Sequence, residues 1–183
     1  MINNSSEEAL VGQLRSGDDN ALRLMYSRYI RYLTAVCSRY ISGDEDVRDV
    51  LQNTFLKIFS SLDKFEFRGE GSLKAWISRI LLNEIITFEK QNQKLDFVEL
   101  NTETMDTPDE DPDSFDIPPE VIHKMIRELP DGYRTIFNLY VIEGKSHREI
   151  AQLLGIKENS SASQLHRAKA MLAERIRNYK SEQ

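Results

Sequence analysis

The sequence of 183 residues is poor in cysteine, glycine and proline, and it carries almost no signal for β-strands. A single cysteine, Cys37, excludes an internal disulfide and a metal site built from cysteines. Because Cys37 lies among regularly spaced apolar residues, it is predicted to pack in a core rather than to act as a nucleophile. Eight glycines and five prolines are too few for a collagen-like or turn-rich all-β protein.

Long hydrophobic runs are lacking as well. The longest apolar stretches, such as residues 76–82, are short and contain Arg79, so no membrane insertion is expected. The first eight residues have neither a basic nor an apolar segment, which argues against a signal peptide. These features predict a cytoplasmic location. The hydrophobic content of 40% is too high for a wholly disordered chain.

The charge is unevenly distributed along the chain. The net charge of −6 argues at first against a basic nucleic-acid-binding protein. Residues 1–95 contain 13 basic and 13 acidic side chains, whereas residues 96–120 contain ten acidic side chains, no basic ones and four of the five prolines. Residues 121–183 contain 11 basic and seven acidic side chains. The pattern predicts two domains, 1–95 and 121–183, joined by an acidic linker.

Helical periodicity dominates both domains and predicts an all-α protein built from two small helical bundles. In the first domain, apolar residues recur every three or four positions within 10–14, 22–36, 47–62 and 73–88. Polar residues and glycine at the segment boundaries are expected to cap or separate these helices. They are Ser5 with Glu8 as a capping box, Asp18 or Asp19, Gly43 and Ser72.

The second domain shows a similar series of start and stop signals. Pro118 and Pro119 suit the beginning of a helix, and Pro130 ends it. Ser146 and Glu149 form a second capping box, and Gly155 permits a left-handed turn. Asn159 or Ser160 is expected to cap the long helix that follows.

The segment 146–169 has the layout of a helix-turn-helix, with small Ala151 where the two helices would cross. In that motif the second helix lies in the major groove and presents its N-terminal residues to the bases. An ordinary helical hairpin is the alternative, and the positive charge of this domain favours DNA binding. The residues expected to contact bases or phosphates are Ser160, Ser161, Ser163, Gln164, His166, Arg167 and Lys169.

The segment 65–90 combines an aromatic, glycine-containing loop with a helix that carries cations and Trp76. Aromatic and cationic side chains together suit the binding of unstacked single-stranded bases. Trp76 also lies at helical spacing from Leu73, Ile77 and Ile80, which on composition alone favours a core position. Both interpretations of Trp76 stay open.

Metal, cofactor and catalytic sites are not expected. Asp109, Asp111, Asp113 and Glu120 occur at the spacing of a calcium-binding loop, but Ser114 replaces the turn glycine. In so acidic a segment, chance explains this spacing. The three histidines are not paired, and no serine or cysteine stands beside a base, so we expect a protein that is not an enzyme.

The chain resembles the bacterial RNA polymerase sigma factors of the extracytoplasmic-function (ECF) type, in the sigma-70 family. The resembling stretches cover most of both helical domains in the family's order. They are 21–29 (ALRLMYSRY), 46–65 (DVRDVLQNTFLKIFSSLDKF), 68–85 (RGEGSLKAWISRILLNEI), 128–156 (ELPDGYRTIFNLYVIEGKSHREIAQLLGI) and 163–172 (SQLHRAKAML).

The resemblance implies that residues 1–95 correspond to sigma region 2. In the family, the helix at 46–62 binds the coiled coil of the polymerase β′ subunit, and the loop 65–72 with the next helix opens the minus-ten promoter element. The residues at the polymerase-binding positions are Asp49, Gln52, Asn53, Phe55 and Lys57. The residues at the minus-ten positions are Arg68, Lys74, Trp76, Arg79 and Asn83.

Residues 121–183 correspond by the same resemblance to sigma region 4. There the helix-turn-helix reads the minus-thirty-five promoter element and also packs against the polymerase β-flap. The implied partners are therefore core RNA polymerase and promoter DNA, and an anti-sigma factor that holds the protein inactive is expected as well. The family's linker threads through polymerase near the RNA path. In this chain its acidity either mimics nucleic acid or only keeps a tether solvated.

Two stretches depart from the family's pattern. Residues 84–91 are poor in cations where the family often has a basic run, and Ala162 and Gln164 stand where its recognition helix often has basic residues. Fewer phosphate contacts predict weak DNA binding by the free chain and binding to promoters only within polymerase. The alternative functions are a stand-alone helix-turn-helix regulator of operator DNA and a helical adaptor for other proteins.

Overall fold

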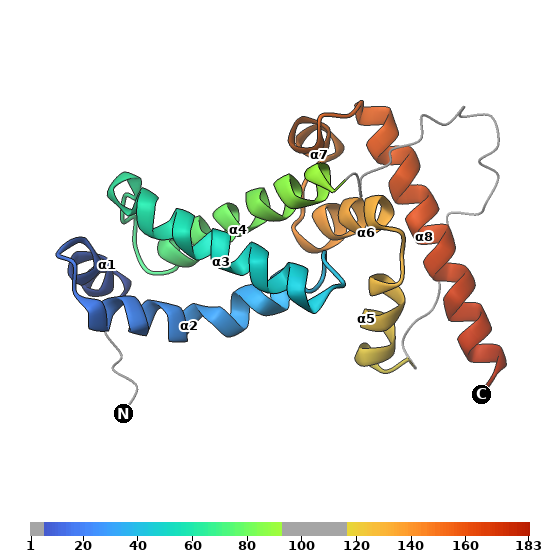
Figure 1. Ribbon diagram of the computed structural model, residues 1–183. Coiled ribbons are helices and arrows are strands. Elements are labelled where there is room, and N and C mark those ends of the chain that lie inside the picture. The colour runs from blue at the N-terminus through green and yellow to red at the C-terminus, as the bar shows by residue number, and fades with distance from the viewer. Residues whose placement is uncertain (1–5, 93–116) are drawn as a thin grey trace. The chain divides into compact units, whose positions relative to one another are not determined.

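The computed structural model describes residues 6–92 and 117–183, and every regular element in these ranges is a helix (Figure 1). The chain divides into two compact units, Met1–Phe88 and Glu89–Gln183. The predicted all-α class is confirmed. Most of the predicted linker lies outside the described residues, as do Asp109, Asp111 and Asp113 of the calcium-like spacing.

The first unit consists of α1 (Glu7–Arg15), α2 (Asp19–Cys37), α3 (Asp44–Ser61) and most of α4 (Ser72–Gln91). Figure 1 shows α2 and α3 side by side, and their apolar faces meet in the core. Cys37 is fully buried, as predicted. The largest fully buried side chains of this unit are Tyr40, Leu10, Met25, Leu33, Ile58, Leu73, Ile77, Leu81 and Ile85.

The caps in the first unit follow the predictions only in part. Asp18 caps α2 as expected, since its carboxylate accepts a hydrogen bond from the Asn20 N–H at 2.8 Å. Ser5 lies outside the described residues, and Ser6 caps α1, since its hydroxyl accepts from the Ala9 N–H. The prediction that Ser72 caps α4 is wrong: Ser72 is already helical, and its hydroxyl bonds back to Arg68 and Gly69.

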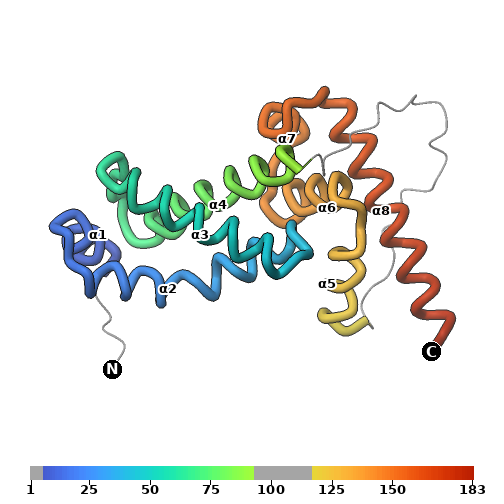
Figure 2. The backbone as a smooth tube through the Cα atoms, viewed as in Figure 1, coloured from blue at the N-terminus to red at the C-terminus, as the bar shows by residue number. Residues whose placement is uncertain are grey.

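The second unit contains α5 (Pro119–Arg127), α6 (Asp131–Phe137), α7 (His147–Leu154) and α8 (Glu158–Ser181). A π-helical turn at Asn138–Ile142 extends α6. Helix α8 packs against α5, α6 and α7, as the tube in Figure 2 shows. The residues that share one core cluster here are Ile117, Met125, Leu129, Ala168, Leu172 and Ile176. Because Ile117 is among them, this core begins before the predicted boundary at residue 121.

Two arginines connect the helices of this unit through backbone carbonyl groups. Arg134 is 4% exposed and donates to the carbonyl oxygens of Arg127 at 2.7 Å and Leu129 at 3.1 Å, at the end of α5. Arg175 on α8 donates to the carbonyl oxygen of Met125 at 2.7 Å. A guanidinium group offers five donors in a fixed plane, so one side chain can satisfy several carbonyls left open at a helix end.

The predicted helix-turn-helix is present as α7, a turn and α8. Ser146 and Glu149 form the predicted capping box, in which each side chain accepts from the other residue's N–H. Gly155 follows with φ of 74°, the left-handed conformation that glycine adopts without strain. The expected caps of α8 are wrong: Lys157 precedes the helix without a side-chain cap, and Asn159 and Ser160 lie inside the first turn.

Ser146→Ala is expected to lower the free energy of unfolding of the second unit by about 1 kcal/mol, because the Glu149 N–H loses its acceptor. Ser160→Ala is the matched control, since Ser160 caps nothing and alanine suits a helix interior. Urea unfolding followed by circular dichroism measures both. Equal stability of the two variants would contradict the assigned caps.

The capping box also predicts a dependence of stability on pH. The hydrogen bond from the Ser146 hydroxyl, followed by the one from its backbone N–H, lowers the pKa of Glu149. A lowered pKa in the folded state stabilises the fold above the ordinary carboxyl range, and this contribution is lost as the pH falls through the folded-state pKa. The stability difference between the wild type and Glu149→Gln should therefore shrink in acid. A stability difference that is constant from pH 7 to pH 3 would refute the contribution of the Glu149 carboxylate to the capping box.

Candidate nucleic-acid and protein interfaces

The segment between α3 and α4 forms an exposed loop anchored by aromatic packing. A short 3-10 turn, Leu62–Lys64, leads into Phe65, which is buried against Trp76 with 5.0 Å between ring centroids. Gly69 and Gly71 then take φ values of 105° and 90°. Side chains other than glycine rarely adopt these angles, so the path of the loop depends on both glycines.

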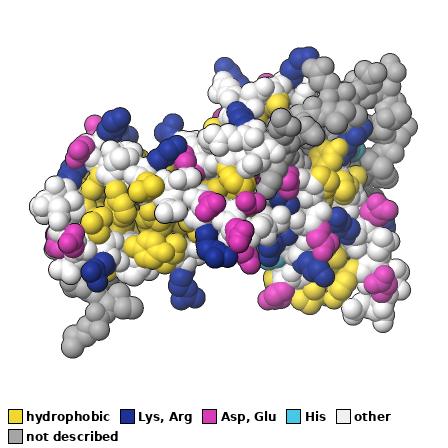
Figure 3. All heavy atoms as spheres, in the orientation of Figure 1, with side chains coloured by type: hydrophobic (Ala, Val, Ile, Leu, Met, Phe, Trp, Pro, Cys, Tyr) yellow, Lys and Arg dark blue, Asp and Glu magenta, His cyan; other side chains and the backbone are white. Residues whose placement is uncertain are grey.

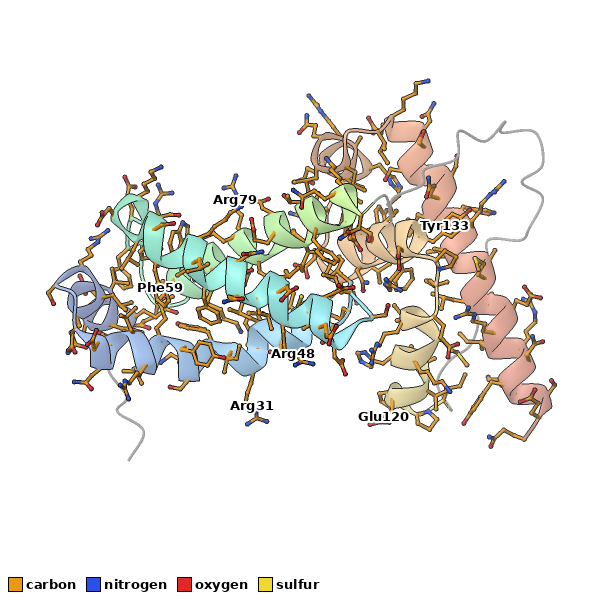
Figure 4. All side chains as sticks on the ribbon, viewed as in Figure 1. Arg31, Arg48, Phe59, Arg79, Glu120 and Tyr133 are labelled. Carbon is orange, nitrogen blue, oxygen red and sulfur yellow. The ribbon has the colours of Figure 1, made fainter. Side chains whose placement is uncertain are left out.

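The predicted minus-ten residues lie on this loop and on the first three turns of α4. Arg68, Lys74, Arg79 and Asn83 are exposed, and Figure 4 shows Arg79 pointing away from the helices. Trp76 is only partly buried, so its ring both packs on Phe65 and keeps an accessible side. Trp76, Arg79 and Asn83 share one face of α4, because residues three or four apart lie above one another on a helix.

Tyr32 on α2, which was missed by the sequence analysis, contacts a different face of α4, the one that carries Lys74 and Ser78. The Lys74 ammonium lies 4.2 Å from the centroid of the Tyr32 ring, within the range of a cation–π interaction. The Tyr32 hydroxyl and the Ser78 hydroxyl are 3.0 Å apart and share a hydrogen bond. In the sequence, Tyr32 is marked only as an aromatic residue between the regularly spaced apolar positions of 22–36.

The predicted polymerase-binding residues of α3 divide into two groups. Asp49, Gln52, Asn53 and Lys57 are exposed, although Lys57 forms an ion pair with the buried Glu84 of α4. Phe55 is 6% exposed and lies 4.8 Å from Tyr26 and 6.1 Å from Phe59, measured between ring centroids. Phe55 is therefore mostly buried and does not project from α3 as the other four do, although it lines the groove between α2 and α3.

An apolar groove runs between α2 and α3, and we call it the α2–α3 groove. Leu56 is 61% exposed and Tyr26 is 51% exposed, which are high values for large apolar side chains. Figure 3 shows the hydrophobic surface of this unit as a continuous patch. The groove is lined by Tyr26, Ile30, Thr34, Ser38, Asp44, Val47, Arg48, Leu51, Gln52, Phe55, Leu56 and Phe59. Leu56 directly follows the buried Phe55 and lies outside the apolar spacing of α3. An apolar residue at such a position could have predicted this exposed site from the sequence.

Burial separates the predicted contacts of the helix-turn-helix. Ser161 and Gln164 are 0% and 2% exposed, and the Ser161 hydroxyl lies 3.0 Å from the Nδ1 atom of His147. The expectation that these two side chains face DNA is therefore corrected, because they face the interior. Ser160, Ser163, His166, Arg167 and Lys169 are partly exposed.

Two exposed cations of the helix-turn-helix were not among the predicted contacts. Arg148 lies on the first turn of α7, and Lys157 directly precedes α8. Three adjacent apolar side chains at the π-helical turn are also exposed, namely Tyr140, Val141 and Ile142, at 39%, 47% and 45%. The Tyr140 ring stacks on His147 with 4.6 Å between centroids, which connects this apolar patch to α7.

Comparisons with known proteins agree with these two units. Residues 25–95 match Sigma-70 region 2, and residues 120–172 match Sigma-70, region 4. The chain is 27% identical to the ECF RNA polymerase sigma-E factor of Haemophilus influenzae, over 96% of this chain and 98% of that protein. It is 24% identical to the factor of the same name from Escherichia coli K12, over 93% and 94% of the two chains.

A solved structure, that of CnrH in complex with the cytosolic domain of CnrY, is similar over 95% of this chain and 99% of that chain. The sequence identity is 23% and the TM-score is 0.49.

The chain belongs to the sigma-70 family and is an RNA polymerase sigma factor of the ECF type. It is accordingly a transcription initiation factor that directs RNA polymerase to promoters. Within residues 6–92 and 117–183, no helix is long and apolar enough to cross a membrane. The same residues contain no cluster of three or more histidine, cysteine or acidic side chains arranged to hold a metal ion.

Phe55→Ala is expected to lower the free energy of unfolding of the first unit by about 3 kcal/mol, because it leaves a cavity beside Tyr26 and Phe59. Gln52→Ala, one turn earlier on an exposed position, should change it by less than about 0.5 kcal/mol. Urea unfolding of the two variants measures this difference. A stable Phe55→Ala protein would restore Phe55 as a surface residue.

Proposed function

We propose that three surfaces divide the work of promoter recognition in this protein. The α2–α3 groove and the neighbouring polar residues of α3 bind the β′ coiled coil of core polymerase. The loop before α4 and the exposed face of α4 open the minus-ten element and hold its unstacked strand. The first turn of α8 reads the minus-thirty-five element. The protein carries out no catalysis of its own.

The observation that carries this proposal is the partly exposed Trp76 beside a glycine loop and several cations. An aromatic face accepts any stacked base, and the cations Arg68, Lys74 and Arg79 attract the backbone phosphates. Arg79 and Asn83 lie on the same face of α4 as Trp76, and Arg68 lies on the loop before this helix, so a polar, cationic surface adjoins the ring. The packing of Trp76 on Phe65 orients the ring and so supports base stacking.

In the second unit, the surface around the start of α8 supports binding to duplex DNA. Arg148 at the start of α7, Lys157 before α8 and Arg167 farther along α8 are exposed or partly exposed, and cations at such positions can meet phosphates when a helix enters the major groove. Ser160 and Ser163 are polar, partly exposed residues of the first turns of α8. The apolar patch of Tyr140, Val141 and Ile142 suits a contact with the polymerase β-flap.

An anti-sigma factor is a further expected partner. A protein that covers the α2–α3 groove would bury Leu56 and Tyr26 and thereby exclude core polymerase. Such competition would hold the sigma factor inactive in the cytoplasm until the inhibitor is removed.

Reconstitution with core RNA polymerase tests the proposal as a whole. The purified chain, added to core enzyme with a promoter library, should yield specific run-off transcripts. Failure to bind core enzyme would refute the proposal, and tight salt-sensitive binding of promoter duplex by the chain alone would instead favour a stand-alone regulator. The promoters recovered also supply DNA for the experiments below.

Leu56→Glu tests the α2–α3 groove. Placing a charge at this exposed apolar position should weaken binding to core polymerase at least about tenfold, with little change in stability because Leu56 is 61% exposed. Ser60→Glu, also exposed on α3 but absent from the groove lining, is the matched control. Fluorescence anisotropy of the labelled chain measures both affinities. Equal affinities of the two variants would remove the groove from the polymerase interface.

Arg79→Ala tests the minus-ten surface in the assembled holoenzyme. Removal of this cation should lower the affinity for a single-stranded minus-ten oligonucleotide about tenfold and make its salt dependence shallower by about one contact. Arg31→Ala is the control, since Figure 4 shows Arg31 pointing into solvent from α2. An Arg79→Ala holoenzyme with unchanged affinity and salt dependence would exclude Arg79 from the site.

A further inference from the structure

Two side chains of α1 reach the segment that leads into α4 and hold it at both ends. Arg15 donates from its Nη2 atom to the carbonyl oxygens of Leu62, at 3.3 Å, and Phe65. Glu7 accepts at its Oε2 atom from the N–H groups of Gly71, at 2.8 Å, and Leu73, at 3.0 Å. The exposed part of the loop lies between these two attachments.

Glu7 acts as a cap that comes from a distant part of the sequence. The first N–H groups of a helix have no partner within it, and a carboxylate there also interacts favourably with the helix dipole. Ser72 does not serve as the cap of α4, so Glu7 takes that role across 66 positions of sequence from Leu73. A carboxylate bound to two N–H groups makes strong, charge-assisted hydrogen bonds.

The connection is reciprocal. Glu70, in the exposed loop, accepts at its Oε1 atom from the backbone N–H of Glu7, at 3.0 Å. Glu7 is the first residue of α1. The loop therefore satisfies the first N–H group of α1, in addition to the cap by Ser6, while α1 caps α4. The loop and α1 therefore hold each other in place.

Tyr29 fixes the orientation of the Glu7 carboxylate from beneath. Glu7 is 6% exposed, and its Oε1 atom accepts from the Tyr29 hydroxyl at 2.9 Å. Burial, followed by the hydrogen bond and the charge of Glu7, raises the pKa of Tyr29 to about 12. Tyr29 therefore remains a hydrogen-bond donor throughout the physiological pH range.

The loop needs such attachments because of its glycines. Gly69 and Gly71 give the segment many accessible conformations when it is free, and ordering it on binding DNA would be entropically unfavourable. A loop that is already ordered in the free protein avoids that cost when it binds its ligand.

We propose that Glu7 is a positioning residue for minus-ten recognition, which orders the loop between Phe65 and Ser72 without touching DNA. The inference depends on the proposed role of this loop in binding the unstacked strand. It adds α1 to the recognition machinery and assigns it a specific chemical task, the capping of α4.

The first test measures the order of the loop without DNA. Glu7→Gln removes the charge: an amide oxygen in the place of Oε2 is only a neutral acceptor for the two N–H groups, and an NH2 group then faces the Tyr29 hydroxyl in place of an acceptor. Hydrogen exchange of the full chain should become about tenfold faster at Gly71 and Leu73, the loss expected for charged hydrogen bonds. Exchange in the core of α2 and α3 should stay unchanged. Glu8→Gln, the same change at the next, exposed residue, is the matched control.

Tyr29→Phe provides a second variant that keeps the packing of the ring. It removes only the hydroxyl that orients Glu7, so a smaller acceleration confined to the same two amides is expected. Unchanged exchange in both Glu7→Gln and Tyr29→Phe would overturn the inference. Equal acceleration throughout the first unit would also overturn it, because Glu7 would then support the whole unit rather than the loop.

The second test measures recognition in the holoenzyme with a single-stranded oligonucleotide that carries the minus-ten sequence of a recovered promoter. Glu7→Gln should weaken binding about fivefold to tenfold at unchanged affinity for core polymerase, and Glu8→Gln should not. Arg68→Ala serves as the reference for the loop itself. If Arg68→Ala has no effect, the proposed role of the loop fails. If Arg68→Ala weakens binding and Glu7→Gln does not, only the inference about Glu7 fails.

Discussion

A buried carboxylate can remain in a protein interior only if hydrogen-bond donors surround it, and Glu7 meets this condition through the start of α4. The path of the chain into α4 depends on this pairing. It docks the short helix α1 and begins α4 at a defined residue, and together with Arg15 it sets the path of the loop. Trp76 and Arg79 lie on α4, so the position at which this helix begins also fixes where their side chains lie. The geometry of the proposed minus-ten surface thus follows from an interaction with a residue 64 positions earlier in the sequence.

The second unit uses cations where the first uses a carboxylate. Arg134 and Arg175 bind carbonyl oxygens near the end of α5, so the termini of two helices are satisfied by charges of opposite sign in the two units. The cation-poor stretch of α4 also has a structural explanation. Glu84, where the family often has a basic run, is buried and paired with Lys57, and Ile85 and Ile86 belong to the core. This stretch of α4 contributes to packing more than to DNA binding.

Local patterns in the sequence predicted the helices, the Asp18 cap, the Ser146 capping box and the left-handed Gly155, because each depends on residues within one turn. Ser72, Asn159 and Ser160 were wrongly expected to cap because several polar residues stand at each boundary and the choice among them depends on tertiary packing. The burial of Phe55, Ser161 and Gln164 depends on which neighbour covers each helix face, which spacing alone does not state. Glu7 could not be identified at all, since the Gly71 and Leu73 N–H groups that it caps lie more than sixty positions away.

The exposed apolar groove has a consequence for the protein before it meets any partner. Leu56 and Tyr26 remain in contact with water in the free chain, and such patches favour association between copies at high concentration. The exposed groove thereby limits the concentration at which the free protein stays monomeric. Any molecule that covers the groove removes this tendency, so occupancy of the groove and solubility of the chain are coupled.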